Sequence, residues 1–205
     1  MSGLIVKVST MNRNGGPRYP WAEYLQVVAL REQSLRTPPV PLGATDEEIA
    51  HHEERLGRRL PPSYRQFLEV ANGWRGTVVL PPLLHLCQLG WTRDVDPALG
   101  ESWGPARESR PTVPDEEYFV YGPEQDCIHL RCEYIPDTLR IAQYIEGQTL
   151  MLNPHVITPD GEWEVWDFAI WYPGAHRYRS FWEYMTRILG KPRPELKVPS
   201  LPDRG

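Results

Sequence analysis

The 205-residue sequence lacks several features that define common classes of protein. Its three cysteines are an odd number at irregular spacing, which excludes a disulfide scaffold and is typical of a reducing compartment. No apolar run approaches the roughly 18 residues of a membrane span, and the apolar segment 4–8 is too short for a signal peptide. We therefore expect a cytoplasmic protein with no membrane association.

Positive charge is also in short supply. The formal net charge is -5, which disfavours a nucleic-acid binder that relies on a broad basic face. The chain has no glycine-rich phosphate loop and no serine elbow of the hydrolase type. Its 22 prolines disfavour an all-helical bundle, whereas 40% hydrophobic residues and 8 tryptophans provide for a sizeable core.

Helical signals occupy the first third of the chain. After a break at residues 11–17, the spacing of Trp21, Tyr24, Leu25, Val28 and Ala29 predicts a helix that ends near Leu35. Thr45 and Glu48 form a capping box that begins a helix ending at Gly57. A second helix is expected from Pro62, with the apolar stripe Tyr64, Phe67, Leu68 and Ala71, up to the stop signal Asn72-Gly73. The sequence thus predicts a helical hairpin over residues 45–72.

The second half of the chain changes period. Residues 90–114 contain many prolines and glycines and predict a long surface excursion, pinned to the body by Trp91 and Trp103. Strands are predicted at 118–121, 128–132, 139–145, 149–152 and 162–168, with turns at Glu146-Gly147 and Asp160-Gly161. A last helix is expected from a second capping box, Ser180 with Glu183, to Gly190.

This order of elements predicts an α+β fold, and the short turns between successive strands predict an antiparallel sheet. Residues 1–40 are expected to form an N-terminal segment and first helix packed on the same domain. The domain itself is expected over residues 41–190, followed by a proline-rich tail at 191–205.

Two groups of residues resemble a known family. The first runs through Gly43-Ala44-Thr45, Glu48-Ile49, Leu56-Gly57, Leu60-Pro61-Pro62-Ser63-Tyr64-Arg65, Phe67-Leu68 and Asn72-Gly73. The second comprises Gly161-Glu162-Trp163 and the segment from Trp171 to Phe181. Both are similar to the SUKH superfamily of Smi/Knr proteins, over roughly residues 41–190.

The resemblance implies an α+β fold in which N-terminal helices and a C-terminal helix pack on a central antiparallel sheet. It also implies a binding protein rather than an enzyme. Bacterial members of the superfamily are mostly immunity proteins that neutralise a cognate polymorphic or contact-dependent toxin by direct binding, and many such toxins act on nucleic acid. Fungal relatives act as interaction hubs. The motif residues themselves are typical core and turn residues, so they indicate a shared fold rather than a site.

Charge is distributed unevenly along the chain. Residues 101–170 hold fourteen acidic and four basic residues. Such a surface attracts a basic partner and raises the association rate, although solvated acids also serve solubility alone. Asp115, Glu116 and Glu117 beside Tyr118 combine charge with an aromatic residue, as interface anchors do. We therefore predict a partner-binding surface that comprises Asp115, Glu116, Glu117, Tyr118, Asp126 and Glu133.

Thiols and imidazoles suggest a competing chemistry. Cys127 with His129, His85 with Cys87, and nearby Cys132 include the ligand types of zinc, but their spacing matches no closed zinc pattern. Cys127 could pair with His155 or His176 as a nucleophile, yet its acidic surroundings oppose a reactive thiolate. His51-His52-Glu53 has no third ligand. We expect core thiols, no metal, no cofactor and no catalytic residue.

The function predicted from the sequence is that of a non-catalytic, cytoplasmic bacterial immunity protein that binds a toxin domain, with a basic nuclease as one candidate. The alternative is a regulatory interaction module of the Smi/Knr type that has no toxin partner. Neither requires nucleic acid or a membrane.

Overall fold

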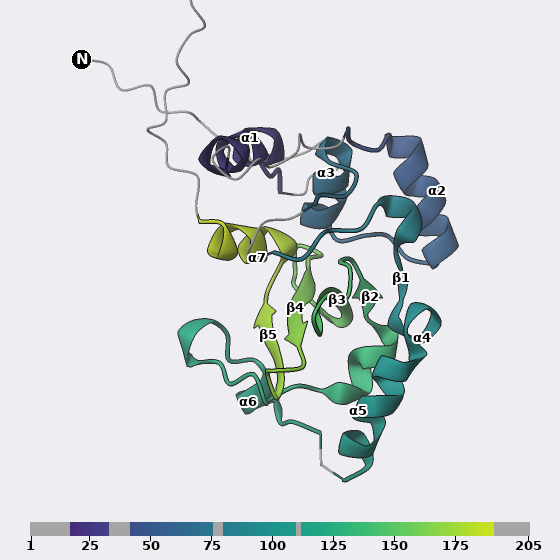
Figure 1. The fold of residues 1–205 in the computed structure, drawn as a ribbon, viewed down its shortest axis with the longest axis vertical. Coiled ribbons are helices and arrows are strands. Elements are labelled where there is room, and N and C mark those ends of the chain that lie inside the picture. Colours follow the sequence, from purple (N-terminus) through teal and green to yellow (C-terminus); the bar gives the residue numbers. More distant parts are fainter. Residues whose placement is uncertain (1–16, 33–41, 76–79, 110–111, 191–205) are drawn as a thin grey trace, which may run out of the picture.

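The computed structural model describes residues 17–32, 42–75, 80–109 and 112–190. A five-stranded antiparallel sheet of order β1-β2-β3-β4-β5 lies at the centre, and helices precede and follow it (Figure 1). The predicted α+β class is therefore confirmed. The strands are β1 (Gly90–Trp91), β2 (Leu139–Arg140), β3 (Gln148–Ile157), β4 (Trp163–Ala169) and β5 (Gly174–Tyr178).

Helices lie above and below the sheet in Figure 1. One side carries α1 (Trp21–Glu32), α2 (Asp46–Leu56), α3 (Pro62–Val70) and α7 (Phe181–Ile188). The other side carries α4 (Thr92–Val95), α5 (Pro97–Ser109), α6 (Asp115–Tyr118) and the 3-10 turns η3 (Gly122–Glu124) and η4 (Cys132–Asp137). A further 3-10 turn, η2 (Leu86–Gln88), precedes β1. No helix in the described part of the chain is long and apolar enough to cross a membrane.

The predicted helical hairpin is present. The Thr45 hydroxyl accepts a hydrogen bond from the Glu48 amide at 3.2 Å, and the Glu48 carboxylate accepts from the Thr45 amide at 2.8 Å. Gly57 ends α2 with a left-handed φ of 69°, a conformation that favours glycine. Helix α3 begins at Pro62, as expected, and ends at Val70. Local signals therefore define this part of the fold.

The cap of α7 follows the prediction only in part. The Ser180 hydroxyl accepts from the Glu183 amide at 3.0 Å. The Glu183 carboxylate, however, accepts from the amide of Arg179 rather than from that of Ser180. The helix begins at Phe181 and ends at Ile188, two residues before Gly190. The predicted tail 191–205 lies outside the described residues.

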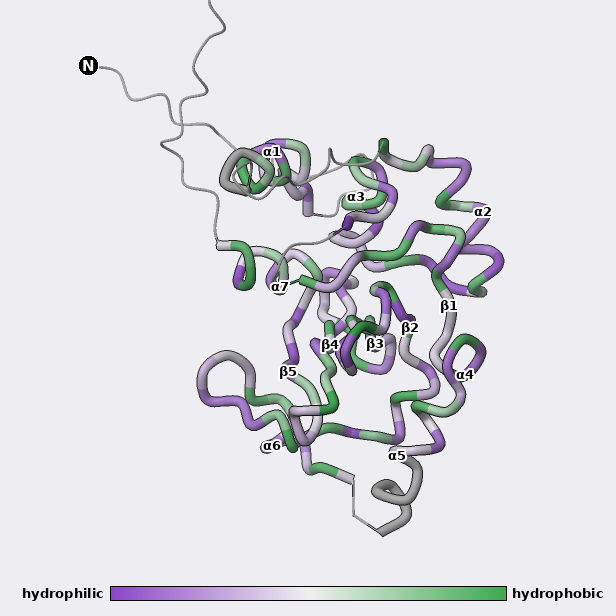
Figure 2. Tube along the Cα trace, viewed as in Figure 1, coloured by the Kyte–Doolittle hydropathy of each residue, from purple (hydrophilic) through white to green (hydrophobic). Residues whose placement is uncertain are grey.

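Helix α1 packs on α3 and α7 and is hydrogen-bonded to both. Trp21, Tyr24, Leu25 and Val28 are buried, as the helical spacing predicts. The Trp21 indole donates to the carbonyl of Ser63 at 2.8 Å, and the Tyr24 hydroxyl donates to the carbonyl of Met185 at 2.6 Å. The predicted extension of this helix to Leu35 lies outside the described residues. Helices α1, α3 and α7 each mix hydrophobic and hydrophilic residues (Figure 2), as expected for helices with one face on a core.

Three of the strand predictions need correction. The segments 149–152 and 162–168 do lie in β3 and β4, but only Leu139 and Arg140 of 139–145 form a strand. Residues 118–121 form no strand, because Pro114 and the three acids after it start the helical turn that ends at Tyr118. Residues 128–132 lie in turns and a loop that tertiary contacts hold in place. The sequence analysis also missed β1 and β5. The turns at Glu146-Gly147 and Asp160-Gly161 are present, with φ angles of 51°, 86° and, at Gly161, 85°.

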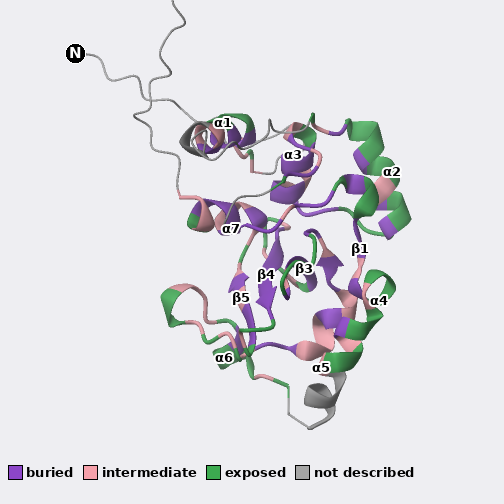
Figure 3. Ribbon diagram, viewed as in Figure 1, coloured by how far each residue is buried: buried purple, intermediate pink, exposed green. Residues whose placement is uncertain are grey.

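Alternate residues of the strands enter two separate cores. Leu150, Leu152 and Val165 pack with the upper helices, whereas Met151, Trp166 and Phe168 pack with Leu99, Leu130, Ile135 and Ala175. This alternation is the expected period of a strand buried on both faces. Figure 3 shows the strands buried between helices whose outer surfaces, such as that of α2, are exposed.

The predicted surface excursion over 90–114 is largely helical instead. Helices α4 and α5 form there, because Leu99 and Trp103 pack into the second core and stabilise a segment with poor helix propensity. The two expected tryptophan contacts are present. Trp103 meets Phe168 edge-on at 5.1 Å, and Trp91 stacks with Trp163 at 6.3 Å between ring centroids.

Candidate protein-interaction surface

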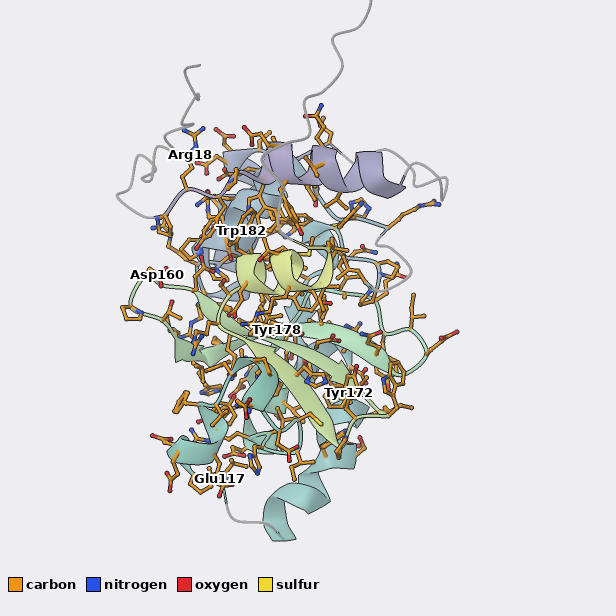
Figure 4. All side chains as sticks on the ribbon, turned by 90° about the vertical axis from the view of Figure 1, so that its left-hand side faces the viewer. Arg18, Glu117, Asp160, Tyr172, Tyr178 and Trp182 are labelled. Carbon is orange, nitrogen blue, oxygen red and sulfur yellow. The ribbon has the colours of Figure 1, made fainter. Side chains whose placement is uncertain are left out.

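Helix α6 displays the predicted acids. Asp115, Glu116 and Glu117 are exposed in its single turn, and Asp126 is exposed in the loop that follows. We call these four residues the acidic surface. Glu133, in η4, is half-buried and so contributes less to it. Figure 4 places Glu117 at the end of the molecule opposite α1.

The loop after Ile128 packs against this surface and pairs with part of it. The Arg131 guanidinium contacts the Asp115 carboxylate at 2.5 Å, and the His129 imidazole lies 3.3 Å from the Glu117 carboxylate. Among the described residues, Glu116 and Asp126 make no ion pair. These two carboxylates are therefore the ones that a cationic partner meets without competing with an internal cation.

Tyr118 does not lie where the prediction needs it. The sequence suggested an aromatic group displayed beside the acids, but Tyr118 is fully buried and therefore does not present its ring to a partner. The reason is tertiary contact, because the Tyr118 hydroxyl donates to the buried Glu164 carboxylate and the Arg177 guanidinium lies over its ring. Phe119 and Ile128, which are 44% and 45% exposed, are the apolar side chains near the acidic surface that reach solvent.

A buried carboxylate holds this region to the sheet. Glu164 on β4 accepts four hydrogen bonds, from the hydroxyls of Tyr118 (2.5 Å) and Tyr121 (2.6 Å), the amide of Asn153 (3.0 Å) and the indole of Trp166 (2.7 Å). Burial, and then the Glu164 charge, raise the pKa of both Tyr118 and Tyr121, so both remain protonated donors. Four donors satisfy a carboxylate that burial would otherwise penalise.

The guanidinium of Arg177 also contacts Tyr118. Arg177 on β5 is fully buried, lies 4.4 Å from the centroid of the Tyr118 ring and donates to the Tyr118 carbonyl. Its backbone is held by one side chain, since Gln125 accepts from the Arg177 amide at 2.7 Å and donates to its carbonyl at 3.2 Å. These contacts hold the 118–125 segment on β5, so the acidic surface rests on an ordered base.

Not all of the predicted acidity is on the surface. Glu162, Glu164 and Asp167, which the charge count includes, are buried in and around β4. Glu162 accepts hydrogen bonds from the amide and hydroxyl of Ser63 and from the hydroxyl of Tyr19, at 2.6 to 2.8 Å. Burial raises the pKa of Glu162 and of Asp167. Within residues 101–170, the exposed acids therefore lie on the helices and loops rather than in β4.

The sequence missed Glu164 and Arg177 as structural partners. The alternation of side chains along a strand could have predicted the burial of Glu164, because Glu164, Trp166 and Phe168 lie on the same face of β4 and the two aromatic residues enter the second core. No comparable signal exists for Arg177, since arginine is rarely buried and β5 contains glycine and charged residues.

The thiols and imidazoles do not assemble into a site. Cys127 and Cys132 are half-buried and Cys87 is exposed, so the expectation of core thiols was wrong for Cys87 in particular. His155 bonds Asp137 at 3.0 Å and stacks on Tyr134, while His176 meets the Tyr172 ring. Within the described ranges, no three or more His, Cys, Asp or Glu side chains are grouped so as to hold a metal ion.

His51, His52 and Glu53 on α2 differ in burial. Both histidines face outward, and the Nδ1 atom of His52 accepts from Arg55 at 3.1 Å. Glu53 is buried, where its carboxylate accepts from the amide of Leu60 at 2.9 Å. Glu53 therefore connects α2 to the start of α3 rather than facing solvent beside the histidines.

The structure is that of a small α+β protein with an exposed acidic helical turn at one end. The model of the SMI1 / KNR4 family (SUKH-1) matches residues 43–187, which is more than half of the chain. The chain therefore belongs to the SMI1 / KNR4 family, and the resemblance noted in the sequence is confirmed. A search of curated proteins finds no match. Helix α1 lies before the matched region yet packs on it.

Proposed function

We propose that this protein is a cytoplasmic, non-catalytic immunity-type protein that binds a basic toxin domain and blocks it by direct contact. Membership of the SMI1 / KNR4 family supports a binding role. The observation that carries the proposal is the acidic surface, in which Glu116 and Asp126 are exposed without ion pairs on a segment anchored to the sheet.

The physical basis is electrostatic complementarity. An acidic surface accelerates the encounter with a basic protein, and contact between the two excludes the toxin's own substrate. A nuclease domain has a basic cleft for phosphate groups, which acidic side chains on a fixed base are suited to occupy. Because Glu164 and Arg177 hold the base in place, binding orders few additional groups and loses less entropy.

The proposal predicts that a toxin gene lies immediately beside this one, and the test is co-expression with that toxin. Cells that express the toxin should survive when this protein is present, and the two purified proteins should form a stable complex. Failure of the wild-type protein both to protect and to bind would refute the immunity proposal and would favour a regulatory interaction module without a toxin partner.

The place of contact is tested separately by charge reversal. Substituting Glu116→Lys together with Glu117→Lys should lower the association rate by about tenfold at low salt, and the difference should shrink as salt screens the charges. Glu47→Lys with Glu54→Lys is the matched control, because both acids are exposed on α2 and the change in net charge is the same. Equal effects of the two pairs would show that net charge matters but that the acidic surface is not the place of contact.

A further inference from the structure

Four large apolar residues lie in or beside two tight turns that meet at one end of the sheet. Tyr144, Ile145, Ile170 and Trp171 are 43%, 42%, 62% and 54% exposed, respectively. We call these four residues the hairpin-tip patch. It lies at the end of β4 opposite the turn that carries Asp160, as the positions of Asp160 and Tyr172 in Figure 4 show.

The patch is built on fixed backbone. Ile145 and Gln148 exchange both backbone hydrogen bonds, at 3.0 and 2.8 Å, around the Glu146-Gly147 turn. The amide of Ile170 donates to the carbonyl of Gly147 at 2.9 Å, which joins the second turn to the first. The Ile170 side chain also lies directly over Gly147, since a Cβ there would be 2.4 Å from its Cγ1 atom. The two turns therefore form one unit.

Nothing in the fold requires these side chains to be apolar. The neighbouring strand residues Leu150 and Phe168 are fully buried, so the cores are filled without the patch. Single exposed apolar residues are ordinary on protein surfaces, but a group on adjoining turns marks an interaction site. Tryptophan and tyrosine are also the residue types that contribute most to binding at the centre of interfaces.

Charge around the patch restricts what covers it. No lysine or arginine occurs between residues 111 and 130 or between residues 141 and 176, which include both turns. Glu146 belongs to the first turn and is exposed. Asp126, also exposed, precedes Cys127, whose carbonyl accepts from the Ala175 amide at 3.1 Å close to the second turn. Both turns thus contribute no cation, and Glu146 and Asp126 place carboxylates on or near them.

An acidic border disfavours two of the three common occupants. A second copy of this chain would bring the same carboxylates against themselves, and an anionic lipid surface would be repelled. A cationic polypeptide with apolar side chains complements both the patch and its border.

We propose that the hairpin-tip patch is the apolar anchor for a cationic polypeptide partner; this inference rests on the proposed function in taking that partner to be the basic toxin domain. The two surfaces then have different roles. The acidic surface steers the encounter and sets the association rate, whereas Trp171 and Ile170 are desolvated in the complex and set the dissociation rate.

The first experiment uses a defined probe and does not depend on the toxin. The 15N-labelled full chain is titrated with a Leu/Lys amphipathic peptide of about 18 residues, or about five helical turns, and with its Leu/Glu counterpart. We expect the Trp171 indole signal and the amide signals of residues 144–147 and 170–172 to shift with the Leu/Lys peptide only.

Variants then test the anchor. Ile170→Ser and Trp171→Ala should each weaken binding of the Leu/Lys peptide by about tenfold, as expected for central interface residues. Leu42→Ser is the matched control, because Leu42 is 92% exposed and far from both turns in the sequence. Its affinity should equal that of the wild type. Urea unfolding of each variant confirms that the fold is retained.

The second experiment uses the neighbouring toxin domain. Trp171→Ala should raise the dissociation rate about tenfold and leave the association rate within twofold, the reverse of the Glu116 and Glu117 reversal. If wild type does not bind the toxin but the Leu/Lys peptide shifts the patch, the immunity proposal fails and the patch assignment holds. Peptide shifts elsewhere, equal binding of the Leu/Glu peptide, or signals that move with protein concentration alone would each overturn the assignment.

Discussion

Replacement of Trp21 by alanine should destabilise the protein far more than the same replacement at Trp171. Trp21 is 1% exposed and touches the rings of Phe67, Phe181 and Trp182 at 4.8 to 5.5 Å between centroids. Burial of a tryptophan removes about 200 Å² from water, which at about 25 cal/mol per Å² is an upper estimate of about 5 kcal/mol. We expect a loss of about 4 kcal/mol, within the range for aromatic-to-alanine changes in cores.

The assay is urea unfolding at pH 7, followed by circular dichroism because each variant removes a fluorophore. With a slope of about 2 kcal/mol per M, the Trp21→Ala midpoint should fall by about 2 M. Trp171→Ala is the matched control and should cost about 1 kcal/mol or less, since its ring is half exposed. Trp21→Phe should lose about 1–2 kcal/mol, because the hydrogen bond to Ser63 is lost while most of the area is kept.

Equal midpoints for the two alanine variants would refute the packing of α1 described here. Equal midpoints would mean that α1 contributes little to the free energy of unfolding and that the domain is stable from residue 43 onward. A large difference would instead show that a helix outside the matched family region is a full part of the fold.

Three further predictions follow from buried polar groups and a turn. Burial raises the pKa of Glu162 above its ordinary value, so its contribution to stability is full below about pH 4.5 and is lost as pH rises through the folded-state pKa. The difference in unfolding free energy between wild type and Glu162→Gln, measured by urea unfolding, should therefore narrow from pH 4 to pH 8. Tyr118→Phe removes one of the donors to Glu164 and should cost about 1.5–3 kcal/mol in the same assay, whereas an unchanged midpoint would contradict the hydrogen bond. Gly147→Ala should lower the thermal midpoint with a loss of about 1–2 kcal/mol, because φ is 86° and the new Cβ meets Ile170; a variant as stable as wild type would mean that the turn adopts another form.

Local chemistry explains which parts of the fold could be predicted. The Thr45 box, the Gly57 stop and the Glu146-Gly147 turn each depend on residues within a few positions of one another, and all three are present. The stripe beginning at Trp21 also identified a buried face correctly. Family resemblance provided the order of the layers, which periodicity alone does not determine.

The errors lie where distant contacts override local preference. Helix α5 contains Gly100 and Pro105, which have low helix propensity. It forms because the helix places Leu99 and Trp103 against the second core. Strand β5 has no run of branched residues and forms because β4 pairs with it. Glu116 and Glu117 are exposed, as expected of charged side chains. The burial of Tyr118 and the exposure of Trp171 depend on tertiary structure and could not be predicted from the local sequence.

The outer margin of β5 has a consequence for the protein in a crowded cell. Strand β5 ends the sheet, and an open margin of this kind invites pairing with foreign backbone and so leads to fibre formation. Here the Gln125 amide imitates a neighbouring peptide group by engaging both the N–H and the C=O of Arg177. The segment that carries the acids thus also covers this edge of the sheet and leaves fewer free backbone groups there for another chain to pair with.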